Sequence, residues 1–186
     1  MISSGIKFNS FKFLPQSKKL KNRLINLLKN KNQVLNSLSD EYKLNFNKKK
    51  ILKYKKNKNF RIIGMGGSIL GTQAIYDFLN FKIKKKFYFI DNLKPRQNKE
   101  KKLYTNLIVS KSGNTIETIA NTNILIKKNE KNIFITEDKQ SYLNILANKL
   151  KAEIIHHNNY IGGRYSVLSE VGMLPAELMG LNPNKF

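Results

Sequence analysis

From Phe60 to His156, short apolar segments alternate with longer segments in which apolar residues recur every three or four positions. The short segments are rich in Ile, Phe and Val, which is typical of buried strands, and the longer ones are typical of helices. A strand that is followed by a helix pairs in parallel with the next strand, because the helix carries the chain back to the same edge of the sheet. The alternation therefore predicts an α/β fold with a doubly wound, mainly parallel sheet of about five strands and helices on both faces.

The same pattern assigns residue ranges to these elements. The expected strands are Phe60–Gly64, Phe87–Asp91, Asn106–Ser110, Asn132–Thr136 and Glu153–His156. The expected helices are Ser68–Asn80, Arg96–Lys102, Thr115–Lys128, Gln140–Lys149 and a helical segment around Pro175–Leu181. In such sheets ligands bind beyond the carboxyl ends of the strands, so we expect the functional site in the loops that follow the strands.

Residues 1–58 have a different character, because they are polar and rich in Lys and Asn. Apolar residues recur there at helical spacing at Leu20, Leu24, Leu27 and Leu28. A second helical stretch is expected over Glu41–Lys55. We therefore expect residues 1–58 to form an N-terminal helical segment that packs on one domain, residues 59–186.

The chain is strongly basic, with 35 Lys and Arg residues against 12 Asp and Glu residues and a formal net charge of +23. Such a charge is typical of nucleic-acid binding. Base readout and bidentate phosphate contacts favour arginine, however, and the chain has only Arg23, Arg61, Arg96 and Arg164. The lysines are accompanied by many Asn and Ile residues, as A/T-rich coding would produce. We interpret most lysines as solvated surface, expect no specific nucleic-acid partner and keep a basic nucleic-acid binder as the less favoured alternative.

Other classes are excluded by residues that the sequence lacks. It has no cysteine, which excludes a disulfide scaffold, a thiolate metal site and thiol catalysis. No apolar run approaches the ~18 residues of a membrane span, and Met1–Pro15 has no continuous apolar core of a signal peptide. His156 and His157 are neighbours in a strand without a third ligand at metal spacing, so we interpret them as structural or surface residues. We expect a cytoplasmic protein with no metal site and no membrane partner.

The first expected strand ends in the glycine-rich loop Gly64–Ser68, which opens a helix. Glycines let a ligand approach the backbone closely, and a helix N-terminus offers free N–H groups. A dinucleotide site is one alternative, with Asp91 ending the next strand, but its G-x-G-x-x-G pattern requires glycine where Ile69 stands. A P-loop is excluded because no G-K-[ST] segment follows. The other alternative is a tight turn in which Ser68 caps the helix.

The third expected strand ends in the loop Ser110–Thr115, which contains three hydroxyls, one lysine and one glycine. At a helix N-terminus these groups can hold a phosphate monoester through backbone N–H groups and charge-assisted hydrogen bonds. The alternative is a helix start that is capped by a hydroxyl, with Glu117 complementing the helix dipole. Two such loops on one sheet favour a phosphorylated small ligand.

A third loop, Gly162–Ser166, places Arg164 beside two glycines. An arginine that is fixed by a turn can stabilise an anionic transition state without losing its charge. An ordinary loop arginine is the alternative. No pair of carboxylates is placed for acid–base catalysis, and we interpret Asp91 and Glu117 as loop and cap residues.

Taken together, the three loops resemble those of the glucose-6-phosphate isomerase family. Gly64–Gly71 is similar to that family's first sugar-isomerase loop, Val109–Thr118 to the phosphate loop shared among sugar isomerase (SIS) domains, and Asn159–Ser169 to the family signature. The pattern usually continues with Pro or a small residue, where this chain has Glu170. The resemblance extends over Arg61–Leu181, and the order and spacing of the three motifs make it specific.

The resemblance implies a flavodoxin-like SIS fold. It also implies the interconversion of glucose 6-phosphate and fructose 6-phosphate through an enediolate, in glycolysis and gluconeogenesis, without a metal or an organic cofactor. By motif position, the residues around the phosphate of this hexose 6-phosphate substrate would be Ser110, Lys111, Ser112 and Thr115. The sugar would lie against Gly67, Ser68 and Gly163, and Arg164 would stabilise the enediolate.

The resemblance also shows where this chain departs from the family. The family's catalytic Glu and its His and Lys come from a second SIS domain, which this sequence does not contain. We therefore expect the amino-terminal part of such an isomerase, and we expect it to be inactive alone and to form a homodimer only with the C-terminal half. The alternative is a non-catalytic sugar-phosphate-binding SIS module, against which Arg164 argues, because phosphate recognition needs no enediolate stabiliser.

Overall fold

The chain forms two compact units, 1–41 and 42–186. The computed structural model describes residues 17–30, 32–39, 41–93, 102–127 and 129–186. Within the first unit, helix α1 (Lys18–Lys29) follows Ser17, whose Oγ accepts a hydrogen bond from the N–H of Leu20 at 3.2 Å. The apolar stripe predicted for this segment thus lies on a helix, and its leucines are exposed. The short helix α2 (Gln33–Asn36) comes next.

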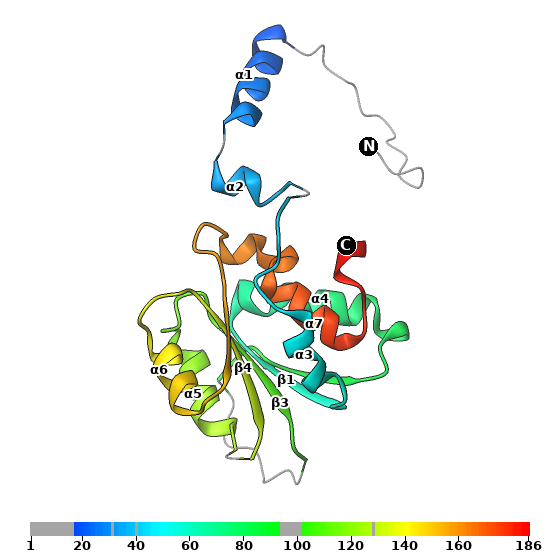
Figure 1. The fold of residues 1–186 in the computed structure, drawn as a ribbon, viewed down its shortest axis with the longest axis vertical. Coiled ribbons are helices and arrows are strands. Elements are labelled where there is room, and N and C mark those ends of the chain that lie inside the picture. The colour runs from blue at the N-terminus through cyan, green and yellow to red at the C-terminus, as the bar shows by residue number, and fades with distance from the viewer. Residues whose placement is uncertain (1–16, 31, 40, 94–101, 128) are drawn as a thin grey trace. The chain divides into compact units, whose positions relative to one another are not determined.

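The second unit contains a five-stranded sheet (Figure 1). Its strands are β1 (Asn59–Ile63), β2 (Lys86–Ile90), β3 (Thr105–Val109), β4 (Lys131–Thr136) and β5 (Glu153–His156). Their order is β2-β1-β3-β4-β5 and every neighbouring pair is parallel, which confirms the predicted fold class. The chain changes direction across the sheet between β1 and β3, and this switch point is where such sheets bind ligands.

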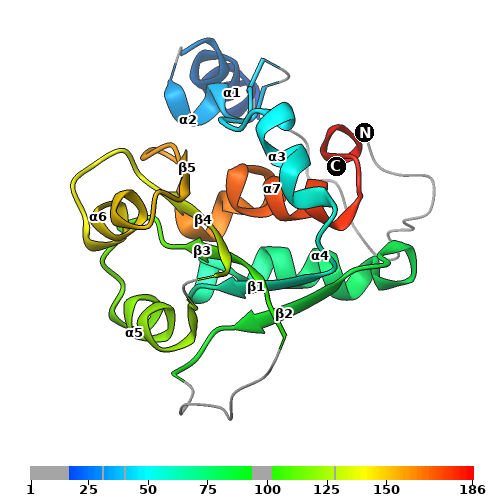
Figure 2. The same cartoon turned by 60° about the horizontal axis from the view of Figure 1, so that its bottom comes forward.

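Helices cover both faces of this sheet (Figure 2). They are α3 (Lys48–Lys55), α4 (Leu70–Phe78), α5 (Ile116–Leu125), α6 (Tyr142–Lys149) and α7 (Glu170–Met179). Helices α3, α4 and α7 enclose one core with Ile62 of β1, whereas α5 and α6 enclose the other with Ile63 of the same strand. Neighbouring strand residues face opposite cores because side chains alternate along a strand.

Short 3₁₀ turns complete the second unit. They are η1 (Gly66–Ser68), η2 (Asn80–Lys82), η3 (Gly163–Leu168) and η4 (Pro183–Lys185). Two of them, η1 and η3, lie in loops that the sequence analysis singles out. Over the described part of the chain, none of the helices has the length and apolar character to cross a membrane.

Helix α7 is buried along its whole length and fixes the loop that precedes it. Pro175 has no N–H, so the carbonyl of Val171 lacks its helical partner. The hydroxyl of Thr72 in α4 donates to that carbonyl instead, at 2.9 Å. The helix begins earlier than the predicted segment Pro175–Leu181, because Ser169 caps it with an Oγ that accepts from a first-turn N–H.

The other predicted boundaries lie within a residue of the observed strands and within a turn of the observed helices, with two exceptions. The stretch expected from Glu41 becomes helical only at Lys48, where the Oδ1 of Asn47 accepts from the N–H of Lys49 at 2.8 Å and starts the helix. The helix expected over Arg96–Lys102 lies almost entirely outside the described residues.

Candidate functional site

The first and third loops touch each other at the switch point. Loop Gly64–Ser68 follows β1, and a Cβ added to Gly67 would lie 2.9 Å from the backbone nitrogen of Arg164. The hydroxyl of Ser166 donates to the carbonyl of Gly163 at 2.7 Å and to that of Gly67 at 3.2 Å. Glycine is required at position 67 because the two backbones approach too closely for any side chain.

The second loop folds around its own hydroxyl groups. Ser110 Oγ and Thr115 Oγ1 share a hydrogen bond of 2.9 Å, and Ser110 Oγ also accepts from the N–H of Gly113 at 3.2 Å. Ser112 Oγ accepts from the N–H of Asn114 at 3.2 Å. The loop therefore holds three hydroxyls at the end of β3, beside the loop that follows β1.

The sequence analysis left open that Ser68 caps the helix after β1 and that a hydroxyl caps the helix after β3. Neither cap is present in the part of the chain that the structure describes. Thr115 occupies the cap position of α5, but its side chain accepts nothing from the first turn. Helix α4 begins after Ile69 without a side-chain cap, so Ser68 does not cap it. Within the described residues, the first-turn N–H groups of these two helices therefore have no side-chain cap.

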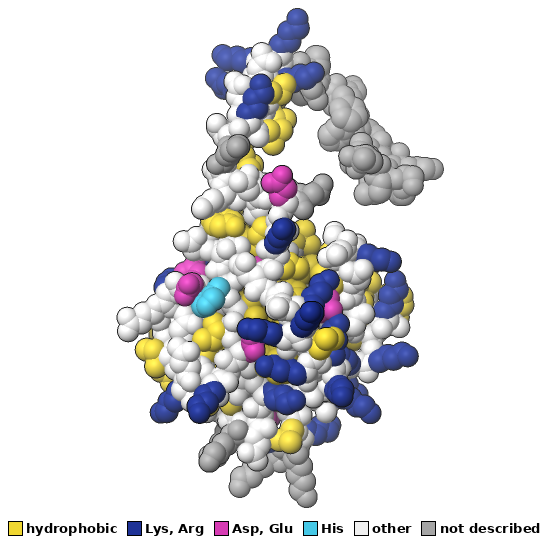
Figure 3. Space-filling view, in the orientation of Figure 1, with side chains coloured by type: hydrophobic (Ala, Val, Ile, Leu, Met, Phe, Trp, Pro, Cys, Tyr) yellow, Lys and Arg dark blue, Asp and Glu magenta, His cyan; other side chains and the backbone are white. Residues whose placement is uncertain are grey.

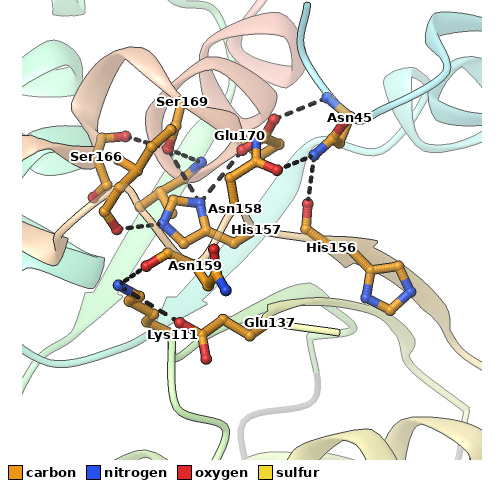
Figure 4. Close-up of polar contacts among 12 residues, drawn as sticks. Asn45, Lys111, Glu137, His156, His157, Asn158, Asn159, Ser166, Ser169 and Glu170 are labelled. Carbon is orange, nitrogen blue, oxygen red and sulfur yellow. Dashed lines mark hydrogen bonds and ion pairs between the residues drawn. The ribbon is translucent and has the colours of Figure 1, made fainter. Parts of the chain in front are cut away.

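Lys111 joins the second loop to the segment that leads from β5 into the third loop (Figure 4). Its Nζ donates to the carbonyl of Asn159 at 2.6 Å and lies 3.5 Å from the Oε1 of Glu137. The other carboxylate oxygen of Glu137 pairs with Lys139 at 2.6 Å. Glu137 is missing from the sequence prediction, although its position directly after β4 places it at the same edge of the sheet.

Arg164 is exposed on the third loop. Within the described residues its side chain forms no hydrogen bond or ion pair, so its guanidinium is free to meet an anion. The three loops therefore bring all of the predicted site residues to one edge of the sheet, with Gly67, Gly163 and Arg164 in contact and the hydroxyls of the second loop beside them.

A second polar cluster lies behind the third loop. Glu170, the departure from the signature, is fully buried at the start of α7. Its Oε1 accepts from the N–H of Asn45 at 2.8 Å and from the hydroxyl of Tyr42 at 3.0 Å, and its Oε2 lies 3.4 Å from Nδ1 of His157. His157 is buried as well, whereas His156 is exposed and lies 3.7 Å from Asp138.

These contacts change the acidity of two groups. Burial by itself would raise the pKa of Glu170, but the hydrogen bonds from His157, from the N–H of Asn45 and from Tyr42 outweigh it, and the pKa lies below its usual value. Burial, and then the negative charge of Glu170, raise the pKa of Tyr42 far above its usual value. Glu170 is thus an ionised carboxylate in a buried site.

Metal ligands do not gather around these residues. In the described ranges of the chain, no three His, Asp or Glu side chains lie together in a way that could hold a metal ion.

Comparisons with known proteins place these loops in a family. The family model "Phosphoglucose isomerase" matches residues 25–183. The glucose-6-phosphate isomerase of Methanocaldococcus jannaschii is 37% identical over 148 residues, which cover 68% of this chain and 34% of that protein. The probable glucose-6-phosphate isomerase of Methanococcus maripaludis is 31% identical over 179 residues, which cover 82% of this chain and 37% of that protein. The chain thus spans about a third of the length of these curated relatives.

Two solved structures are similar in fold. A hypothetical protein from Thermus thermophilus superposes with a TM-score of 0.62 at 26% identity, over 73% of this chain and 37% of that one. The NanR protein of Vibrio vulnificus, complexed with ManNAc-6P, superposes with a TM-score of 0.57 at 19% identity, over 87% of this chain and 63% of that one. By its sequence match and its fold, this chain belongs to the phosphoglucose isomerase family.

Proposed function

We propose that this chain is the amino-terminal SIS-type part of a glucose-6-phosphate isomerase and that it binds hexose 6-phosphates at the switch point of its sheet. Residues 59–186 form the binding domain in this proposal. The observation that carries it is the meeting of three loops, after β1, β3 and β5, around two helix N-termini that lack side-chain caps. Open N–H groups beside hydroxyls and a lysine suit a phosphate dianion.

The phosphate lies against the second loop. Ser110, Ser112 and Thr115 provide hydroxyl donors, and Lys111 provides a charge. The uncapped first turn of α5 provides backbone N–H groups and the positive end of the helix dipole. In the same turn Thr118 supports this assignment, because its buried Oγ1 has no hydrogen-bond partner within the described residues.

The sugar extends from the phosphate toward the first and third loops. Gly67, Ser68 and Gly163 lie against it, at the point where the backbones of the first and third loops meet. Arg164 faces the carbons between which the isomerase moves a proton. Its permanent charge stabilises the enediolate more than the neutral sugar, and that difference is what accelerates a reaction.

Proton transfer requires a free base within hydrogen-bond reach of the sugar. Among the described residues, Glu137 pairs with Lys111 and Lys139, and Glu170 is buried with His157. Glu117, in the first turn of α5, we interpret as a residue that complements the helix dipole. We therefore propose that these 186 residues bind the substrate but do not turn it over alone, and that turnover belongs to the longer protein that the relatives represent.

A non-catalytic sugar-phosphate-binding module is the second candidate, which the likeness in fold to a protein complexed with ManNAc-6P favours. The two candidates differ in what Arg164 does. A five-carbon aldonic acid phosphate carries a carboxylate where the enediolate charge develops, so it tests that role directly. If the chain is part of an isomerase, Arg164→Met weakens the binding of this analogue more than the binding of fructose 6-phosphate. If the chain is a non-catalytic module, the affinities for both ligands fall equally.

Isothermal titration of the full chain with fructose 6-phosphate tests binding. Lys111→Met should weaken binding about tenfold or more, because a charged hydrogen bond to the phosphate is lost. Lys139→Met is the matched control, since Lys139 contacts the same Glu137 from outside the three loops, and its affinity should stay within about twofold. Absence of binding by the unmodified chain would overturn the proposal, and isomerase turnover by that chain would overturn the claim that it is inactive alone.

A further inference from the structure

The proposed function leaves one buried cluster unused. His157 and Glu170 stand at the two ends of the segment that carries Arg164, and their side chains are 1% and 0% exposed. His157 follows β5 directly, and Glu170 is the first residue of α7. Two ionisable groups buried this deeply are costly unless each is paired.

The neighbours of His157 determine where its protons lie. Nε2 is 3.2 Å from the carbonyl oxygen of Ile161, which can only accept, so Nε2 carries a proton. Nδ1 is 3.4 Å from the ionised carboxylate of Glu170 and 3.4 Å from the hydroxyl oxygen of Ser169. That hydroxyl directs its own proton to the carbonyl of Ser166 at 2.7 Å. Both ring nitrogens therefore face acceptors, which favours a doubly protonated imidazolium.

Glu170 is held in turn by the segment before α3. Asn45 and Tyr42 donate to its Oε1, and the side-chain amide of Asn45 donates to the carbonyl of His156 at 3.2 Å and to Oδ1 of Asn158 at 3.3 Å. Figure 4 shows Glu170 between His157 and Asn45, whereas Lys111 contacts Asn159 and Glu137. The carboxylate of Glu170, which follows the third loop, thus contacts His157, which precedes it.

A continuous series of hydrogen bonds connects this cluster to Arg164. The hydroxyl of Ser169, which contacts His157, donates to the carbonyl of Ser166, and the hydroxyl of Ser166 donates to the carbonyls of Gly163 and Gly67. Arg164 lies in the chain between Gly163 and Ser166, which this series joins. Among the described residues, its own side chain makes no hydrogen bond or ion pair that would hold the backbone in place.

We propose that a charged His157–Glu170 pair fixes the backbone of the third loop and thereby positions Arg164 for an anionic ligand. Both are positioning residues, since neither contacts the ligand in the proposed function. The ligand part of this inference rests on that function, whereas the ion pair and the order of the loop do not.

The ion pair is tested first, without any ligand. The chain has only two histidines, so a sample labelled with ¹⁵N-histidine gives two resolvable imidazoles in long-range ¹H–¹⁵N spectra, and exposed His156 serves as the internal reference. We expect both nitrogens of His157 to be protonated at neutral pH, and Nδ1 to lose its proton in Glu170→Gln. A neutral His157 in the unmodified chain would overturn the proposal.

Hydrogen exchange tests the order of the loop. Glu170→Gln should increase amide exchange over residues 162–168 about tenfold relative to helix α6, because a charged hydrogen bond is lost at the base of the loop. The matched control is Glu130→Gln, which breaks a buried ion pair with Arg61; it should not increase exchange in the loop relative to α6. Unchanged exchange in Glu170→Gln would overturn the proposal.

Titration with fructose 6-phosphate then connects the pair to Arg164. Glu170→Gln should weaken binding about tenfold, and His157→Gln combined with it should add little, because both act through one contact. In an Arg164→Met background, Glu170→Gln should have no further effect. A loop that loosens in a chain that binds no sugar phosphate would overturn the proposed function and leave the pair established; an equal loss in both backgrounds would overturn the action through Arg164.

Discussion

At position 113 a single glycine determines the shape of the second loop. Its φ is +68°, in the left-handed region that side chains disfavour, and an added Cβ would lie 2.6 Å from Cβ of Ser141 and 2.9 Å from Oγ1 of Thr136. We expect Gly113→Ala to lower the free energy of unfolding by about 2–5 kcal/mol, because a left-handed backbone costs about 1–2 kcal/mol and overpacking about 1–3 kcal/mol. Urea unfolding measures the loss.

Gly66 provides the comparison, since its φ is +54° and nothing lies within 4 Å of an added Cβ. Gly66→Ala should cost only the backbone component, about 1–2 kcal/mol. Equal losses at both positions would show that the crowding around Ser141 is not what excludes a side chain from the loop.

Glu130 forms the other buried ion pair of the described chain, with Arg61 in β1. Both of its oxygens lie 2.9 Å from Nη2 of Arg61, and they also accept from Asn106 and from the N–H groups of Tyr104 and Lys127. In Glu130→Gln an amide N–H₂ would face these donors, so we expect a loss of about 3–5 kcal/mol in the free energy of unfolding.

An exposed pair shows the contrast. Lys53 and Glu153 lie 3.1 Å apart, with the lysine side chain 55% exposed. Lys53→Met should change the free energy of unfolding by about 1 kcal/mol or less in the same urea experiment. A loss as large as that of Glu130→Gln would contradict the assignment of the larger effect to burial.

At the scale of elements, the strands were predictable because burial on both faces produces continuous apolar runs that few other structures show. The starts of the helices were less predictable from the sequence. The helix expected from Glu41 begins at Lys48, and α7 begins before its predicted segment, because in each case one polar side chain caps the first turn. Caps depend on local geometry that periodicity does not report.

The positions of the candidate site residues in the fold were predictable where these residues follow strands in sequence, as they do in the first and second loops. The hydrogen-bond and ion-pair partners of those residues were not predictable from the sequence. Lys111 contacts Glu137 and Asn159, and Glu170 contacts residues before α3 that are more than 120 positions away. Such contacts arise from the topology of the sheet and the packing of α7, and no local pattern of residue types indicates them.

The start of α7 makes stability depend on pH through Glu170. Its folded-state pKa is lowered, so the contribution of its carboxylate is fully present above the unfolded pKa and is lost as the pH falls through the folded value. The difference in free energy of unfolding between the unmodified chain and Glu170→Gln should therefore be largest near neutral pH and shrink as the pH falls from about 6 to 3. Urea unfolding over that range measures it, and a difference that is independent of pH would contradict an ionised, stabilising Glu170.

At the scale of the whole molecule, the net charge of +23 remains to be explained. Lys and Arg side chains are spread over the face drawn in Figure 3 and are not gathered at one site. Of the 35 Lys and Arg residues of the chain, the proposed function uses only Lys111 and Arg164. The rest can contribute a long-range attraction for anions, but salt screens such a field within about 8 Å at physiological ionic strength.

Lysines at the opposite end of the sheet make it possible to distinguish local contacts with the ligand from the long-range attraction of the net charge. Lys58, Lys86 and Lys131 are exposed at the amino ends of β1, β2 and β4, a strand length of roughly 16 Å from the loops, which is twice the screening length. Replacing all three with Gln should leave the affinity for fructose 6-phosphate within about twofold at physiological salt, although it removes three times the charge that Lys111→Met removes. Titrations of both variants at low and physiological salt test this. If the triple variant binds fructose 6-phosphate as weakly as Lys111→Met does at physiological salt, the overall field and not the loop attracts the ligand. If the unmodified chain shows salt-sensitive RNA binding that the triple variant loses, the nucleic-acid alternative is restored.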